Sequence, residues 1–252
     1  MCTPAGVVDL TTGRLRKADP QRDLHSRATS VTPHRMETPR WRTLLTDSFR
    51  EDADGQKSID YLQLMLGHSV TGEAGTLRFP FLLLDETGGV DRSVLLDTVI
   101  RILGDYAYVV PPAFLDARSF CSEHVVEPSE LHGRRLIVCE ASGVGGRLDE
   151  RRIRLLCSDE PIKVRQASQG YCTFAPTHQL WLTGDRRSEV FLGKHTVWRR
   201  MRILPIAQTA PKGYRPDNLA SELVREEGPG ILQWLIEGAR RVLEGREQPV
   251  GQ

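Results

Sequence analysis

The sequence has little of what marks several common protein classes. Its 34 lysines and arginines nearly balance its 33 acidic residues, so the formal net charge is only +1. No overall electrostatic field therefore favours nucleic acid or a membrane as a partner. It contains no apolar run long enough to cross a bilayer, no recognisable secretory leader, and five scattered cysteines without a C-x-x-C pair. We therefore expect a reduced, cytoplasmic protein with no membrane partner.

Two signatures of hydrolytic enzymes are also missing. The chain carries neither H-E-x-x-H nor G-x-S-x-G, so a zinc hydrolase and a serine hydrolase have no support. With 252 residues, of which 39% are hydrophobic, it is long enough to bury a sizeable core. One large domain, or one domain with a small appendage, is expected.

The most informative stretch predicts a strand, a glycine-bearing turn and a helix. The apolar run 79–84 predicts a buried strand, and apolar residues at helical spacing predict a helix from Ser93 to Leu103 that stops at Gly104. This order is the local architecture of a phosphate-binding loop, in which backbone N–H groups at a helix N-terminus point at an anion.

The chemistry of this loop departs from the pattern G-x-x-x-x-G-K-[ST]. Ser93 fits strictly, and Arg92 keeps the positive charge of the lysine. Glu86 and Asp91 replace the two glycines, and carboxylates this close to a triphosphate would repel it.

The rest of the chain predicts an α/β sheet with helices on both faces. Further strands are expected at 134–140, 179–183 and 200–206, and a hairpin at 162–165 and 171–174. Helices are expected at 40–49, at about 58–70 with Gly67 as its cap, and at 148–156, 217–226 and 229–243, while Pro111 and Pro112 argue against regular structure in 106–115. Glu140 and Asp185 follow strands, at the edge where open α/β sheets bind ligands.

Taken together and in this order, the pieces resemble the superfamily 3 helicase domain of phage and plasmid primase–helicases, a P-loop AAA+ type. The stretches that carry the resemblance are 9–15, 39–41, 64–72, 93–97, 103–107, 131–138, 174–182, 197–205 and 227–235. The resemblance implies a P-loop NTPase (AAA+-like) sheet flanked by helices, with a small helical subdomain in front. It divides the chain into an initial strand and linker (1–40), the helical subdomain (41–75), the P-loop NTPase-like core (76–207) and C-terminal helices (208–252).

The resemblance also implies ATP and Mg²⁺ as cofactors, and DNA and a homo-oligomeric, hexameric ring as partners. By resemblance the nucleotide contacts fall on Thr87, Gly88, Gly89, Val90, Asp91, Arg92 and Ser93. The metal would be held by Ser93 and Glu140, and the catalytic positions are Glu140, Asp185, Arg199 and Arg200. DNA phosphates would be contacted by Lys163 and Arg165 of the hairpin.

Two functions follow from the altered loop. The chain is either a superfamily 3-type DNA helicase or translocase domain with weakened ATPase activity, or a catalytically inactive P-loop-fold fragment acting in DNA binding or ring assembly. Glu140 lies one residue before the acidic position of the family. A shift of one residue along a strand turns the side chain to the other face of the sheet, so the register of this strand decides whether Glu140 reaches the metal.

Overall fold

Strands and helices alternate through the middle of the chain, from about residue 81 to residue 166. A computed structural model describes residues 1–49, 53–73, 81–85, 91–116, 128–140, 148–158, 160–166, 170–185, 201–206 and 218–245. Its helices are α1 (Pro39–Phe49), α2 (Ala53–Thr71), α3 (Asp91–Leu103), α4 (Pro112–Leu115), α5 (Glu150–Cys157) and α7 (Leu219–Leu243), with 3-10 turns η1 (Gly104–Tyr106) and η2 (Pro128–Leu131). Its strands are β1 (Cys2–Thr3), β2 (Gly6–Asp9), β3 (Arg14–Arg16), β4 (Phe81–Asp85), β5 (Ala107–Val110), β6 (Leu136–Glu140), β7 (Ile162–Gln166), β8 (Gly170–Phe174), β9 (Gln179–Asp185) and β10 (Arg202–Ile206).

Five strands form a parallel central sheet in the order β10-β4-β9-β6-β5. The expected α/β architecture is therefore confirmed. A small antiparallel sheet of β1, β2 and β3 and the separate β7–β8 hairpin complete the described strands.

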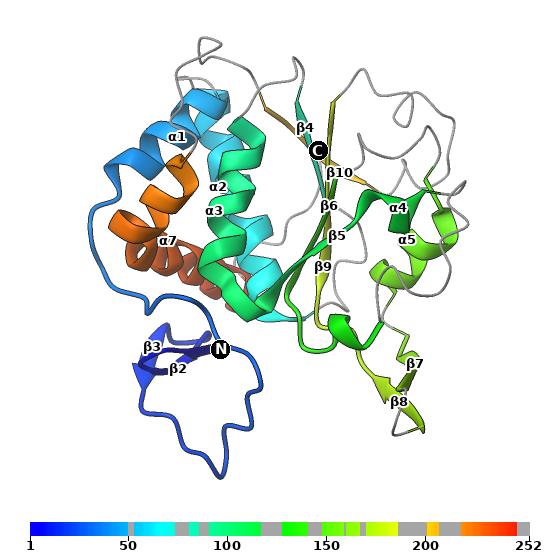
Figure 1. The fold of residues 1–252 in the computed structure, drawn as a ribbon. Helices are drawn as coiled ribbons and strands as arrows, with labels where there is room; N and C mark the ends of the chain where they lie inside the picture. Colours follow the sequence, from blue (N-terminus) through cyan, green and yellow to red (C-terminus); the bar gives the residue numbers. More distant parts are fainter. Residues whose placement is uncertain are drawn as a thin grey trace.

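The strand order places helices on both faces of the sheet. After β4 the chain runs through α3 to β5 at the far edge, and then returns through β6 and β9 to β10. Parallel connections are right-handed, so a reversal of direction moves the connecting helices to the other face. Figure 1 shows α1, α2, α3 and α7 on one side of the sheet and α4 and α5 on the other.

Each face of the sheet packs a separate hydrophobic core. Leu136 and Val138 of β6 face the core built with α1, α2, α3 and α7, whereas the intervening Ile137 faces the core built with α4 and α5. This alternation is the period of two expected of a strand buried on both faces. Helices from the segments 41–75 and 208–252 thus share one core with α3.

Helices α2 and α7 approach so closely that glycines are required between them. A Cβ added to Gly67 would lie 2.3 Å from the backbone carbonyl carbon of Gly238, and one added to Gly238 would lie 2.4 Å from the carbonyl oxygen of Gln63. The expectation that Gly67 caps α2 is therefore wrong, since the helix continues to Thr71. Gly67 is there because the backbone of α7 leaves no room for a side chain.

Helix α7 is one helix of 25 residues, where the sequence predicted two. Pro229 lies inside it, next to Gly228 and Gly230. Gly230 lets the N-terminal segment pack directly on the helix, because a Cβ there would lie 2.7 Å from Cγ of Met36. Tertiary packing thus holds the helix through a proline that would favour a break in isolation.

The N-terminus of α1 is capped by a carboxylate from α7. Glu227 is only 5% exposed, and its two oxygens accept hydrogen bonds from the backbone N–H groups of Arg40 and Trp41, both at 2.9 Å. Pro39 has no N–H, so these are the first two donors that the helix leaves unpaired. The contact joins α1 to α7, two helices that lie far apart in the sequence.

Other local predictions have mixed outcomes. The hairpin and the strands β6, β9 and β10 are confirmed, and β6 and β9 are buried as expected. The expected burial of β10 is wrong in part, because β10 is the edge strand of the sheet and its Ile203 is 51% exposed. The lack of regular structure expected around Pro111 and Pro112 is wrong, because strand β5 ends just before them and α4 begins at Pro112, a position where a missing N–H costs nothing. Among the described residues, no helix has the length and apolar character needed to cross a membrane.

Two buried histidines lie next to the first residue of β9, Gln179. His68 of α2 is 1% exposed and its Nε2 lies 3.0 Å from Nε2 of Gln179, so the amide N–H donates to a neutral imidazole. His178 is 2% exposed, with Nε2 3.1 Å from the carbonyl oxygen of Leu156. Burial lowers the pKa of each histidine to about 4.

The close contact of α2 and α7 can be tested by adding one methyl group. We expect Gly67→Ala to lower the free energy of unfolding by about 1–3 kcal/mol, because the backbones must separate. Gly228→Ala in α7 is the matched control, since its Cβ would lie 3.4 Å from Val31 and would gain helix propensity. Urea denaturation followed by circular dichroism measures both, and equal stability of the two variants would contradict the packing described.

The buried histidines predict a loss of stability in mild acid. The unfolded chain takes up protons at these histidines near pH 6.5, whereas the folded chain does so only near pH 4. Stability should therefore be fully present above pH 6.5 and fall between pH 6.5 and 4, by up to about 3 kcal/mol per histidine. Denaturation of wild type and His178→Gln across this range measures it. A wild-type slope that the substitution leaves unchanged would contradict the assignment.

Candidate functional site

The carboxyl ends of the central strands meet at one edge of the sheet. In the parallel register Asp85 of β4 pairs with Asp185 of β9, and Glu140 of β6 pairs with Thr183 of β9. Three acidic residues from three strands that are separate in sequence therefore lie at the same edge. The sequence predicted this edge for Glu140 and Asp185, and the register places both there.

The strand order makes the crevice between β4 and β9 a topological switch point. The connection that leaves β4 runs toward β5, and the connection that leaves β9 runs the opposite way, toward β10. Two adjacent strands whose connections run in opposite directions leave a crevice at their carboxyl ends, where open α/β sheets bind ligands.

Helix α3 begins beside this crevice. It starts at Asp91, shortly after β4 ends at Asp85, so its first turn holds Asp91, Arg92 and Ser93. The unpaired N–H groups and positive dipole end of a helix attract anions. Of the predicted nucleotide contacts, Thr87, Gly88, Gly89 and Val90 lie outside the described residues, as do Arg199 and Arg200.

Glu140 lies on the face of the sheet that carries α3. It is the exposed last residue of β6 and shares its parity with Leu136 and Val138, which pack in the core with α3. Its neighbour on β9, Thr183, is 7% exposed and faces the same side of the sheet as Trp181, which lies in the same core. The side chain of Glu140 therefore extends from the edge toward the side where α3 begins.

The described residues contain no group of three or more histidine, cysteine, aspartate or glutamate side chains positioned to hold a metal ion. The edge nevertheless supplies the right kind of donor. Carboxylate oxygens such as those of Glu140, and hydroxyl oxygens such as that of Ser93, are the ligands that Mg²⁺ takes together with substrate phosphates.

The hairpin of β7 and β8 is a second candidate site, at the other end of the sheet. Its base is fixed by Ile162 and Phe174, which are buried, and the Phe174 ring packs edge-on against His132 just before β6, with centroids 5.0 Å apart. Figure 1 shows the hairpin projecting from the body. Lys163 is exposed on it, and Arg165 occupies the register position opposite Tyr171.

Tyr171 is a residue of this hairpin that sequence reasoning treated only as part of a strand. It is 70% exposed, and the ammonium of Lys163 lies 4.8 Å from its ring centroid. In the sequence, Lys163 stands between the apolar residues Ile162 and Val164, an alternation that predicts one exposed face for this strand. The register of the partner strand is what places Tyr171 on that face with Lys163.

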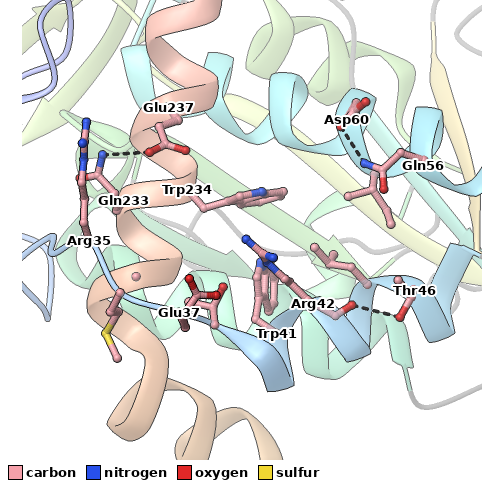
Figure 2. A pocket seen from close by; sticks show the side chains of 15 residues that line it. Arg35, Glu37, Trp41, Arg42, Thr46, Gln56, Asp60, Gln233, Trp234 and Glu237 are labelled. Atoms are coloured by element: carbon pink, nitrogen blue, oxygen red, sulfur yellow. Dashed lines mark hydrogen bonds between the residues drawn. The ribbon is translucent and has the colours of Figure 1, made fainter.

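A pocket of about 810 Å³ lies elsewhere, between the N-terminal segment, α1, α2 and α7 (Figure 2). Trp41 and Trp234 meet in it edge to face, with ring centroids 5.7 Å apart. Arg35, Glu37 and Asp60 give its exposed rim a mixed charge. None of the residues predicted for a site lines it, and it lies apart from both the edge and the hairpin.

Comparison with known proteins finds a family model and solved structures that are similar to this chain. Residues 1–50 match the family model described as D5 N terminal like. Two solved apo structures of the C-terminal region of NrS-1 have a similar fold, with TM-scores of 0.59 and 0.55 at 13% and 12% sequence identity. Each match covers 87% of this chain and 54% of the NrS-1 chain, so this chain spans about half the length of those structures. No curated protein matches this chain.

Proposed function

We propose that this chain is the ATP-driven engine of a DNA translocase, the superfamily 3 helicase domain of a phage or plasmid replication primase. The observation that carries the proposal is the meeting of the α3 N-terminus with the carboxyl ends of β4, β6 and β9 at the switch point of the sheet. That arrangement suits a nucleoside triphosphate, whose phosphates need backbone N–H donors and whose Mg²⁺ needs oxygen ligands.

In this proposal each element at the edge has a separate task. The backbone of the first turn of α3 would hold the phosphates, with Arg92 as their cation, and Ser93 would supply a hydroxyl ligand for Mg²⁺. When bound, Mg²⁺ would supply positive charge against the negative charge that develops on the phosphates. Glu140 would help to hold Mg²⁺ and would accept the proton of the attacking water, and Asp185 would position that water.

A ring of subunits would complete this site. Arg199 and Arg200 would reach the γ-phosphate bound by a neighbouring copy, where a cation stabilises the transition state. The fold shared with the C-terminal region of NrS-1 and the match of residues 1–50 to the D5 N terminal like model support a replication primase–helicase relation.

The residues of the predicted phosphate-binding loop, 86–93, indicate that ATP binding and hydrolysis would be weak. Two unit charges 4 Å apart interact by about 4 kcal/mol at an effective dielectric of 20, so the carboxylates of Glu86 and Asp91 would oppose the triphosphate substantially. Arg92 restores one positive charge, but a planar guanidinium does not replace the compact ammonium of lysine. These residues favour a second candidate, a chain that keeps the scaffold and acts in DNA binding or ring assembly without hydrolysis.

Binding of a fluorescent ATP analogue with Mg²⁺ separates the two candidates. We compare wild type with the triple variant Glu86→Gly, Asp91→Gly, Arg92→Lys. If the site is only weakened, wild type should bind ATP, and the triple variant should bind it about 10-fold or more tightly than wild type does, because the two repulsive carboxylates are gone. Binding by the triple variant alone would favour the assembly role, and binding by neither would contradict a nucleotide site.

The assignment of Glu140 has its own test in the rate of ATP hydrolysis. Glu140→Gln should lower turnover by about 100-fold or more while leaving ATP binding nearly unchanged, because glutamine keeps an oxygen that can bind Mg²⁺ but cannot accept the proton of water. Glu130→Gln is the matched control, since Glu130 is an exposed glutamate that precedes the amino end of the same strand. Equal turnover in both variants would contradict the role given to Glu140.

A further inference from the structure

The exposed face of the β7–β8 hairpin carries an aromatic ring that the fold does not need. Ile162 and Phe174 are buried and fix the hairpin to the body, whereas Lys163, Tyr171 and Thr173 are exposed. An exposed contact between a lysine and a tyrosine contributes little to stability. Core packing therefore accounts for one face of the hairpin and leaves the other without a structural task.

The composition of that exposed face matches one kind of partner. The ring of Tyr171 is 70% exposed, so a flat group can lie against it. Lys163 supplies a cation at the ring, with Nζ 4.8 Å from the centroid, and Arg165 pairs with Tyr171 in the register. An aromatic surface flanked by basic residues is how proteins bind unpaired nucleic acid, with bases on the ring and phosphates on the cations.

We propose that Tyr171 is a base-stacking residue that makes the hairpin selective for single-stranded DNA. The inference rests on the proposed function, because it takes DNA as the partner of the hairpin. The selectivity follows from geometry: bases within a duplex are stacked on one another, whereas an unpaired base offers a free face to the ring. Lys163 contributes phosphate attraction, which acts on single and double strands alike.

The two contributions respond differently to salt, and this makes them separable. A phosphate contact releases a counterion, so its loss lowers the slope of log affinity against log salt by about 0.7 for a single strand. A stacking contact releases none, so its loss lowers affinity at every salt concentration by the same factor. We therefore expect Tyr171→Ala and Lys163→Gln to give different signatures.

The test is fluorescence anisotropy of the full chain, without nucleotide, on a labelled oligothymidine and on a labelled duplex over a range of salt. Tyr171→Ala should weaken single-strand binding by roughly 5- to 150-fold with an unchanged salt slope, and should leave duplex binding unchanged. Tyr171→Phe, which keeps the ring, should bind as wild type does. Lys163→Gln should reduce the salt slope on both DNAs.

Leu24→Ala is the matched control, since Leu24 is an apolar side chain that is 85% exposed on the N-terminal segment. Equal loss of single-strand and duplex binding in Tyr171→Ala would overturn the inference, as would no loss. A change of oligomeric state in Tyr171→Ala with unaltered DNA affinity would instead assign the ring to a contact between copies and would also overturn it. If wild type bound no DNA at all, the proposed function would fail with it, whereas lack of ATP binding alone would leave the stacking role intact.

Discussion

The position of β9 in the sheet is the constraint on which both candidate sites depend. It lies between β4 and β6, so its carboxyl end at Asp185 meets theirs and creates the switch point. The strand is held in place from the helical layer. The indole N–H of Trp181 donates to the hydroxyl of Ser69 at 2.9 Å, and Gln179 meets His68 on the same helix. Moving β9 would separate the acidic strand ends from one another.

The same strand joins the two candidate sites. The hairpin leads through residues 175–178 directly into β9, whose far end lies at the proposed nucleotide edge. A central strand that is hydrogen-bonded on both sides moves only with the sheet, so a displacement of the hairpin would be passed to the edge as a rigid shift. The helical layer adds stiffness, because α2 and α7 touch backbone to backbone at Gly67 and Gly238. In the proposed function, DNA and nucleotide would therefore act at opposite ends of one strand.

Local patterns predicted the elements better than they predicted the packing. Apolar runs located β6, β9 and β10, and the acidic residues at the ends of β6 and β9 marked the candidate edge, because burial and strand polarity are local properties. Gly67 and Pro229 were misread as helix ends, since their partners are segments far away in the sequence. The exposure of Tyr171 was missed for a similar reason, because it depends on the register of two strands. Sequence could name the acidic strand ends, but not the strand order that brings them together.

Hydrogen–deuterium exchange of the full chain with and without Mg²⁺ and ATP tests the central claim most directly, because it reports on backbone N–H groups. The proposed nucleotide site predicts slower exchange in the first turn of α3, whose N–H groups would bind phosphate, and at the carboxyl ends of β4 and β9, which the bound ligand would cover. The pocket of Trp41 and Trp234 should remain unchanged. Protection confined to that pocket, or no protection at the start of α3 at saturating ATP, would contradict a nucleotide site at the switch point.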